Sequence, residues 1–185
     1  MEQLAIIVLF IVVVILGSMA FTPKITAACT AVNASDSCVF TCSINTQLEA
    51  KFQRPIPIDP IDGATSCAES GKVQVLAFHS PTCPYCEEQV SVLDQLEQKY
   101  GDALDIKYVC TSIHEGDDAL CMNNSDGLYL PDEESKSALS KYASAIGGTP
   151  TLVLNCEFTR VGSYAIQDKT EEYNQLDTVL SLLGA

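Results

Sequence analysis

Apolar and polar positions divide the chain into three stretches of different character. Residues 4–16 form an unbroken apolar run, and no charged residue interrupts the longer stretch 4–21. A helix rises about 1.5 Å per residue, so this stretch would be about 27 Å long, close to the thickness of a bilayer's hydrocarbon core. The pattern predicts a short tail at residues 1–3 followed by a transmembrane signal anchor at residues 4–21.

A cleaved signal peptide is the alternative for this first stretch. The small residues of Ser18-Met-Ala20 are compatible with cleavage. However, only Glu2 and Gln3 follow Met1, where such a peptide usually carries basic residues, and the apolar run exceeds the usual length. We therefore expect an uncleaved anchor, with secretion after cleavage as the alternative.

The stretch from residue 22 to residue 71 shows no sustained periodicity. Proline restricts its own φ and biases the preceding residue away from helix, so the proline-rich segment Arg54–Pro60 is expected to be extended. The stretch holds four cysteines, Cys29, Cys38, Cys42 and Cys67. We predict an irregular, cysteine-containing neck over residues 22–71.

From residue 72 the pattern becomes regular, and apolar strands alternate with segments whose apolar residues recur every three or four positions. The predicted elements are strands at 73–79, 104–110, 151–155 and 159–164, helices at 87–100 and 132–146, and a last helix around Leu176–Leu183 capped by Asp168 or Thr170. A polar insertion follows residue 110. This alternation predicts an α/β domain over residues 72–185, with a mixed central sheet flanked by helices.

The charge of the chain narrows the choice of partners. Its formal net charge is −14 at pH 7. Nucleic acids and anionic lipid surfaces are bound by basic patches, so neither is expected as a partner. The acidic residues concentrate between Glu87 and Glu134, which indicates a solvated face, with attraction to basic substrate proteins as the alternative.

The number of cysteines indicates the compartment. The chain has nine, which is unusual in a reducing cytosol and common where disulfides persist. Lys24 follows the predicted span and weakly favours a cytoplasmic location for that side. One lysine is outweighed by the cysteine count, so we expect the domain outside the cytoplasm.

Two of the cysteines have a spacing that suits redox chemistry. Cys83-Pro84-Tyr85-Cys86 lies between a predicted strand and a predicted helix, as a redox Cys-x-x-Cys pair requires. The positive end of a helix favours a thiolate in its first turn, so Cys83 is the expected nucleophile. Cys86 lies deeper in that turn and is the expected resolving thiol, while Pro84 suits the first helical position. A static disulfide or half of a metal site is the alternative.

Over residues 72 to 184 the chain resembles proteins of the thioredoxin fold, because three of their sequence motifs occur in the same order. They are Val-Leu-Ala-Phe-His-Ser-Pro-Thr-Cys-Pro-Tyr-Cys at 75–86, Gly-Gly-Thr-Pro-Thr-Leu-Val-Leu at 147–154 and Arg-Val-Gly-Ser-Tyr at 160–164. The resemblance implies a redox-active disulfide between Cys83 and Cys86. It also implies a cis peptide bond at Thr149-Pro150, where the backbone would pair with an extended substrate.

Two departures from that family leave the direction of electron flow open. Many relatives carry a buried acid six residues before the nucleophile, and here that position is Ala77. The dipeptide between the cysteines, with Tyr85, is typical of glutaredoxins. The candidate modulators of the pair are Pro84, Tyr85 and His79. A cationic His79 would stabilise the thiolate and a neutral one would relay a proton. The alternative for His79 is a packing role at the end of the strand.

Seven cysteines lie outside the pair, and their connectivity does not follow from spacing. We expect Cys29, Cys38, Cys42 and Cys67 to staple the neck, and two of Cys110, Cys121 and Cys156 to pair beside the domain. A four-thiolate metal site built from the neck cysteines is the alternative, although no metal is expected.

Taken together, these patterns predict a single-pass, membrane-anchored thiol:disulfide oxidoreductase outside the cytoplasm, with oxidase or isomerase activity favoured. Exchange proceeds through a mixed disulfide and needs no bound cofactor, but turnover requires a redox partner in the membrane that recharges the pair. The expected substrates are protein thiols and disulfides. The alternatives are a reductase that serves cytochrome or metal-site assembly and a non-catalytic metal-binding module on the same scaffold.

Overall fold

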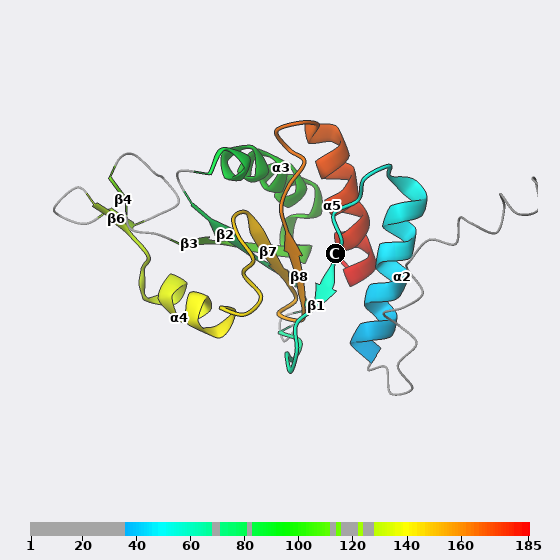
Figure 1. The fold of residues 1–185 in the computed structure, drawn as a ribbon, viewed down its shortest axis with the longest axis horizontal. Coiled ribbons are helices and arrows are strands. Elements are labelled where there is room, and N and C mark those ends of the chain that lie inside the picture. The colour runs from blue at the N-terminus through cyan, green and yellow to red at the C-terminus, as the bar shows by residue number, and fades with distance from the viewer. Residues whose placement is uncertain (1–35, 68–70, 81–82, 112–113, 116–121, 124–127) are drawn as a thin grey trace, which may run out of the picture. The chain divides into compact units, whose positions relative to one another are not determined.

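The computed structural model describes residues 36–185 apart from 68–70, 81–82, 112–113, 116–121 and 124–127 (Figure 1). The predicted anchor at residues 4–21 and the start of the neck, with Cys29, lie outside this part. Within it, no helix combines the length and the apolar character needed to span a membrane.

The order of elements along the chain alternates strands and helices. The elements are α2 (Asp36–Lys51), β1 (Asp59–Pro60), β2 (Val73–His79), α3 (Pro84–Tyr100), the 3-10 turn η3 (Gly101–Ala103), β3 (Leu104–Cys110), β4 (His114–Glu115), β5 (Met122–Asn123), β6 (Leu128–Leu130), α4 (Glu133–Lys141), β7 (Thr151–Leu154), β8 (Phe158–Val161) and α5 (Lys169–Leu183). The strands predicted at 73–79 and 104–110 are confirmed to the residue.

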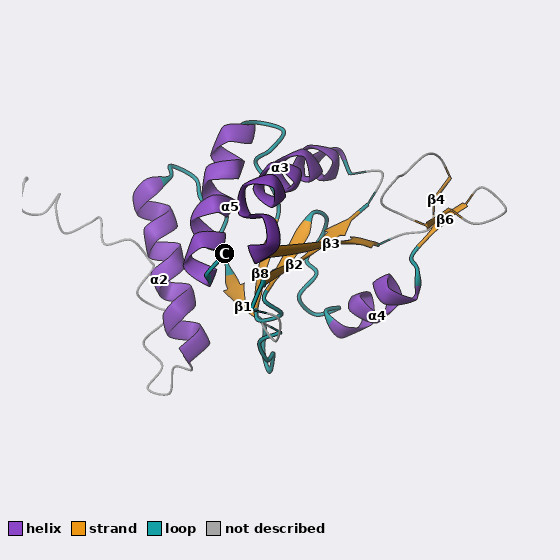
Figure 2. Ribbon diagram, turned by 180° about the vertical axis from the view of Figure 1, so that it is seen from behind, coloured by secondary structure: helices purple, strands orange, loops and turns teal. Residues whose placement is uncertain are grey.

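The central sheet is mixed, as predicted. Its strand order is β1-β8-β7-β2-β3, with β2 and β3 parallel and every other neighbouring pair antiparallel. Parallel neighbours need a crossover connection, which α3 supplies between β2 and β3. Figures 1 and 2 show α3 and α5 together on one face of this sheet and α4 on the other. This arrangement is thioredoxin-like.

The alternation of side chains along β2 builds a core on each face of the sheet. On one face, Val75 and Ala77 join a cluster with apolar residues of α3 and α5, including Val92, Leu96 and Leu176. On the opposite face, Phe78 packs edge-on against the ring of Tyr142 after α4. Because β2 is covered on both faces, five of its seven residues are buried.

The neck is not irregular throughout, so this part of the prediction is wrong. Residues 36–51 form α2, and Asp59–Pro60 forms the edge strand β1, which pairs antiparallel with β8. Phe40, Ile44 and Leu48 recur every four positions, and they pack into the main core. Polar residues and cysteines between them hid this stripe in the sequence.

Side-chain amides fasten the extended part of the neck, one to α2 within the neck and one to α5 of the domain. Asn45 of α2 donates to the carbonyl of Ile58 (2.8 Å) and accepts from its N–H (2.9 Å). Gln175 of α5 accepts from the N–H of Ile56 (3.1 Å) and donates to the carbonyl of Arg54 (3.3 Å). Each amide therefore replaces backbone partners that an extended segment lacks.

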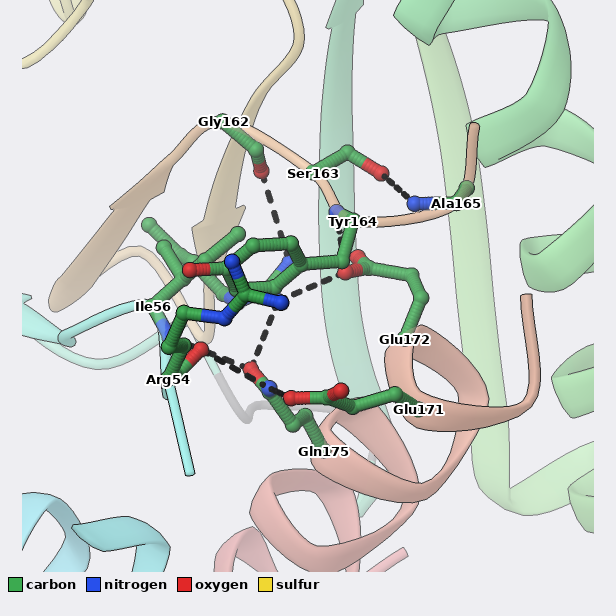
Figure 3. A network of polar contacts seen from close by, with 10 residues as sticks. Arg54, Ile56, Gly162, Ser163, Tyr164, Ala165, Glu171, Glu172 and Gln175 are labelled. Carbon is green, nitrogen blue, oxygen red and sulfur yellow. Dashed lines mark hydrogen bonds and ion pairs between the residues drawn. The ribbon is translucent and has the colours of Figure 1, made fainter. Parts of the chain in front are cut away.

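A buried ion pair lies beneath this junction (Figure 3). Arg160 of β8 contacts Glu172 of α5 through two bonds of 2.6 and 2.9 Å, and both side chains are fully buried. Glu172 also accepts from the N–H of Tyr164 (2.8 Å), and Arg160 donates to Gln175 (3.3 Å). The network joins β8, α5 and the neck.

Several helix boundaries differ from the sequence pattern for local reasons. The helix predicted from residue 87 begins at Pro84, because Pro84 suits the first turn after the extended residue Cys83. The helix predicted to reach residue 146 ends at Lys141, where Tyr142 leaves the helical conformation and packs under the sheet. Asp168 is confirmed as the cap of α5, since it accepts from the N–H of Glu171 (3.0 Å).

Candidate functional site

The Cys-x-x-Cys pair lies where β2 leads into α3. Cys83 is the N-cap residue with an extended backbone, and its N–H donates to the carbonyl of Ser80 (3.0 Å). The N–H of Cys86 donates to the carbonyl of Cys83 (3.0 Å), closing the first turn. Cys83 is partly exposed, whereas Cys86 is buried. Both are free thiols, so the structure shows the reduced pair.

Burial separates the chemistry of the two thiols. It is the largest of the effects that raise the pKa of Cys86 to about 12, and a hydrogen bond with Cys83 adds to it. Hydrogen bonds involving Ser80 and Thr149 act in the opposite direction. Cys86 therefore stays protonated at neutral pH, which leaves the partly exposed Cys83 as the thiol that an external disulfide can meet.

The predicted Thr149-Pro150 step lies against the pair. The peptide bond between these residues is cis, as the resemblance implied. The thiol of Cys83 donates to the carbonyl of Thr149 (3.2 Å), and the Thr149 side chain lowers the pKa of Cys86 through a hydrogen bond. One residue thus contacts both thiols, although it lies more than sixty positions away.

Backbone contacts hold this step in place. The N–H of Gly162 donates to the carbonyl of Pro150 (2.8 Å), and the hydroxyl of Thr151 donates to the carbonyl of Gly148 (2.7 Å). A Cβ atom added at Gly147 would lie 3.4 Å from a side-chain carbon of Val161, so glycine lets the two segments lie close together. The three sequence motifs therefore meet at one end of the sheet.

The candidate modulators differ in position. Pro84 and Tyr85 are exposed beside Cys83, and Tyr85 is 38% exposed, so its ring offers an apolar surface there. His79 is buried, and its carbonyl accepts from the N–H and hydroxyl of Thr111 (3.0 and 2.8 Å), which fits packing at the end of β2. Ala77 is also buried and provides no acid.

Two features near the pair were missed by the sequence analysis. Gln89 lies one turn beyond Cys86 on the buried side of α3 and is 2% exposed. Neither polar atom of its amide has a hydrogen-bond partner among the described residues. Glu88 forms an ion pair with Lys169 at the start of α5. The only available signal for Gln89 was its position on the stripe of buried residues of α3.

The pairing expected for the other cysteines is wrong at Cys67. Cys67 of the neck is bonded to Cys156, which follows β7, across 89 positions. Cys42 is a free thiol, and Cys110 is disulfide-bonded. Cys67 is therefore not available to a staple within the neck or to a four-thiolate metal site. Cys29, Cys121 and the side chain of Cys38 lie outside the described part.

The described residues contain no cluster of three or more His, Cys, Asp or Glu side chains placed to hold a metal ion. The site geometry consists of two thiols of unequal exposure and the backbone of Thr149.

Comparisons with known proteins give partial likenesses. No protein-family model matches the chain. Two curated proteins named "Probable Thioredoxin", from Methanothermobacter marburgensis and Methanothermobacter thermautotrophicus, are each 38% identical to it over 37 residues. This segment is 20% of the chain and 44% of each relative, so the match spans less than half the length of these relatives.

Solved structures give likenesses of fold at low identity. Oxidoreductase DsbA from Xylella fastidiosa is 13% identical, with 67% of this chain and 93% of that chain covered and a TM-score of 0.47. Oxidoreductase NmDsbA1 from N. meningitidis is 14% identical, with 67% and 90% covered and a TM-score of 0.45. Likenesses at this level carry no argument about family or activity. The thioredoxin-like class follows from the strand order and the flanking helices of this chain.

Proposed function

We propose that the chain is a membrane-anchored thiol:disulfide oxidoreductase that exchanges disulfides with protein substrates outside the cytoplasm. The observation that carries this proposal is the unequal pair at the start of α3, in which Cys83 is partly exposed and Cys86 is buried with a raised pKa. Exchange needs one sulfur that meets the substrate and one that acts only within the protein. The carbonyl of Thr149 lies 3.2 Å from the Cys83 sulfur. An extended substrate could therefore pair with the backbone at Thr149 while its own sulfur reacts with Cys83.

In the oxidising direction, a substrate thiolate attacks the sulfur of Cys83 in the oxidised pair. The Cys83–Cys86 bond breaks, and Cys86 leaves as a thiolate that takes up a proton, which its raised pKa favours. A second substrate thiolate then attacks the substrate sulfur of the mixed disulfide and releases Cys83. The substrate loses two electrons and the pair gains them.

Turnover then requires a partner that removes these electrons. The apolar run at residues 4–21 supports a location at the membrane, and the nine cysteines support the oxidising side. A membrane redox protein is therefore the proposed partner. No cofactor is required of this chain, because electrons move through sulfur alone.

A reductase for cytochrome or metal-site assembly is the alternative activity, since the same steps run in reverse. Cys83 then attacks the substrate disulfide, and Cys86 must lose its proton to resolve the intermediate. Burial of Cys86 without an acid at Ala77 disfavours that proton loss. In the oxidising direction the same buried thiol must leave as a thiolate, and a thiol of high pKa is a poor leaving group, so burial of Cys86 does not choose between the two directions.

Trapping the intermediate tests the proposal. In the full chain, Cys86→Ser should accumulate mixed disulfides between Cys83 and substrate proteins, visible as reducible adducts on non-reducing gels. Cys83→Ser should form none. Equal trapping by both variants, or by neither, would contradict the assigned roles. Retained metal binding without redox activity would support the module instead.

The reduction potential of the pair, measured in glutathione buffers, tests the direction. A value near about −120 mV marks a disulfide donor, and one near about −270 mV marks a reductase.

A further inference from the structure

A cavity lies far from the Cys83–Cys86 pair. Its volume is about 580 Å³, within the usual range of small-molecule sites. It opens between α4 and the face of β2 and β3, and both Cys67 and Cys156 line it. Gln74 also lines it, five residues before His79, which is about 16 Å along an extended strand. The Cys67–Cys156 disulfide is therefore out of reach of the pair at the other end of β2.

The two sulfurs of this disulfide differ in access. Cys67 is partly exposed, whereas Cys156 is 4% exposed. A thiol that enters the cavity therefore meets the sulfur of Cys67 first, and Cys156 is the leaving sulfur. This asymmetry is the same as that between Cys83 and Cys86.

The side chain of Gln74 is placed to stabilise the reduced form. Its amide oxygen lies 3.0 Å from the sulfur of Cys67 and 3.6 Å from that of Cys156. Sulfurs in a disulfide carry no hydrogen, so these contacts become hydrogen bonds only when the bond opens and the two thiols donate. The amide nitrogen of Gln74 is held by Asp105 (3.3 Å), which orients the oxygen.

The backbone around the disulfide is held without it. The carbonyl of Asn155 accepts from the N–H of Cys67 (3.2 Å), and its side-chain oxygen accepts from the N–H of Gln74 (2.9 Å). The N–H of Asn155 donates to the carbonyl of Gln74 (2.8 Å). Both cysteines thus stay close after reduction, which makes opening and closing of the bond reversible.

Charged groups on the cavity wall indicate what kind of thiol fits. Lys107 pairs with Glu134 (2.7 Å), whereas Lys141 forms no ion pair within the described part. Lys141 is exposed at the end of α4 and lines the cavity. Its ammonium group lies over the ring of Tyr142, 4.9 Å from the ring centre, and Asp132 lines the same wall. Lys141 offers its positive charge to a carboxylate, which many low-molecular-weight thiols carry.

We propose that Cys67–Cys156 is a second exchange site, which reacts with a carboxylate-bearing low-molecular-weight thiol bound in this cavity. The incoming thiolate attacks the sulfur of Cys67, forms a mixed disulfide and releases Cys156, which takes up a proton. A second thiolate attacks the small-molecule sulfur of that mixed disulfide, which yields the small disulfide and the Cys67 thiolate. Two molecules of thiol are oxidised and the protein pair is reduced.

Glutathione tests the proposal in the full chain carrying Cys83→Ser and Cys86→Ser. The folded protein is equilibrated with graded ratios of reduced and oxidised glutathione, quenched with acid and mapped by mass spectrometry. We expect a glutathione adduct on Cys67 and none on Cys156. We also expect the reduced fraction of the Cys67–Cys156 pair to change with the ratio of reduced to oxidised glutathione in the absence of denaturant. A pair that stays oxidised at every ratio until the chain is unfolded would overturn the proposal.

The wild-type chain gives the same readout, because peptides with Cys67 and Cys156 are mapped separately from those with Cys83 and Cys86. The second site is thus tested whether or not the first pair proves active.

Two variants separate an exchange site from a structural staple. Gln74→Leu removes the acceptor of the reduced form, so the equilibrium with glutathione should shift about fivefold toward the disulfide. Lys141→Met should slow adduct formation with glutathione about two- to fivefold, and leave the reaction with uncharged 2-mercaptoethanol unchanged. Equal slowing with both thiols, or no shift in Gln74→Leu, would contradict the assigned roles.

Discussion

At the scale of single residues, burial sets the properties of the site. Cys83 and Cys86 are three positions apart, yet one is partly exposed and the other is 1% exposed. A buried thiolate lacks the solvation that it has in water, so the buried thiol keeps its proton. The amide of Gln89 is also buried, on the same side of α3 as Cys86, and its polar atoms lack hydrogen-bond partners among the described residues.

Raising the pH should destabilise the reduced protein through Cys86. Its pKa rises from 9.0 to about 12, mainly because of burial. A raised pKa of the folded state contributes stability below pH 9, and this contribution is lost as the pH rises toward about 12. Denaturation of the reduced protein at pH 8 and pH 11 should show the loss. Cys86→Ala should show a smaller one, and equal losses would contradict the role of this thiol.

Replacing Gln89 by methionine should stabilise the fold. Methionine has a similar length and no polar atoms to leave unpaired, so Gln89→Met should raise the free energy of unfolding by about 1 kcal/mol. Urea denaturation measures the change. The matched control is Gln95→Met on the exposed side of α3, where the effect should stay within about 0.5 kcal/mol. A clear loss of stability in Gln89→Met would show that the amide has a structural partner.

At the scale of elements, polar contacts decide how segments join. The ion pair of Arg160 and Glu172 connects β8 to α5 in a fully buried setting, and Gln175 extends the contact to the neck (Figure 3). Such a pair costs desolvation, which is offset only when every partner is present. The junction therefore depends on keeping both members of this ion pair, although the Nε of Arg160 has no hydrogen-bond partner among the described residues.

Breaking this pair from one side should be costly. Arg160→Met leaves the carboxylate of Glu172 buried with only the Tyr164 N–H as a hydrogen-bond donor among the described residues, so we expect a loss of about 3–5 kcal/mol in unfolding free energy. The double variant Arg160→Met/Glu172→Leu should lose less than the sum of the two single changes. Lys136→Met, which breaks the exposed pair with Glu133, should change stability by less than about 1 kcal/mol. Strict additivity at Arg160 and Glu172 would contradict the coupling.

At the scale of the whole molecule, the folded unit extends beyond the thioredoxin-like core. Residues 36–185 form one compact unit, because α2 and the extended neck bury Ile44, Leu48 and Ile58 against the domain. The Cys67–Cys156 bond joins the same two parts. The boundary at residue 72 suggested by the sequence pattern therefore cuts through a core.

Two truncations test this boundary. A fragment of residues 36–185 should unfold in one cooperative transition, whereas a fragment of residues 72–185 should lose that cooperativity, because the partners of Ile44, Leu48 and Ile58 become exposed. Chemical denaturation followed by circular dichroism distinguishes them. A shorter fragment as stable as the longer one would show that the neck only rests on the surface.

Local patterns by themselves determined the strands at 73–79 and 104–110, the helix after Cys86 and the redox spacing of Cys83 and Cys86. These features depend on periodicity and on helix-start chemistry, which neighbouring residues specify. The cis bond at Pro150 came from the resemblance of its motif. In contrast, the short stripe of α2 was masked by the polar residues between its apolar positions.

Only the tertiary structure decided which distant groups meet. The partner of Cys67, the burial of Cys86 and Gln89, and the pairing of Arg160 with Glu172 each depend on contacts between segments that the chain separates. Spacing along a sequence does not encode such contacts, because only the packing of the sheet and its helices brings these residues together in three dimensions. The physical reason is that burial is a property of the assembled core, and burial sets both the reactivity of these thiols and the energy of this ion pair.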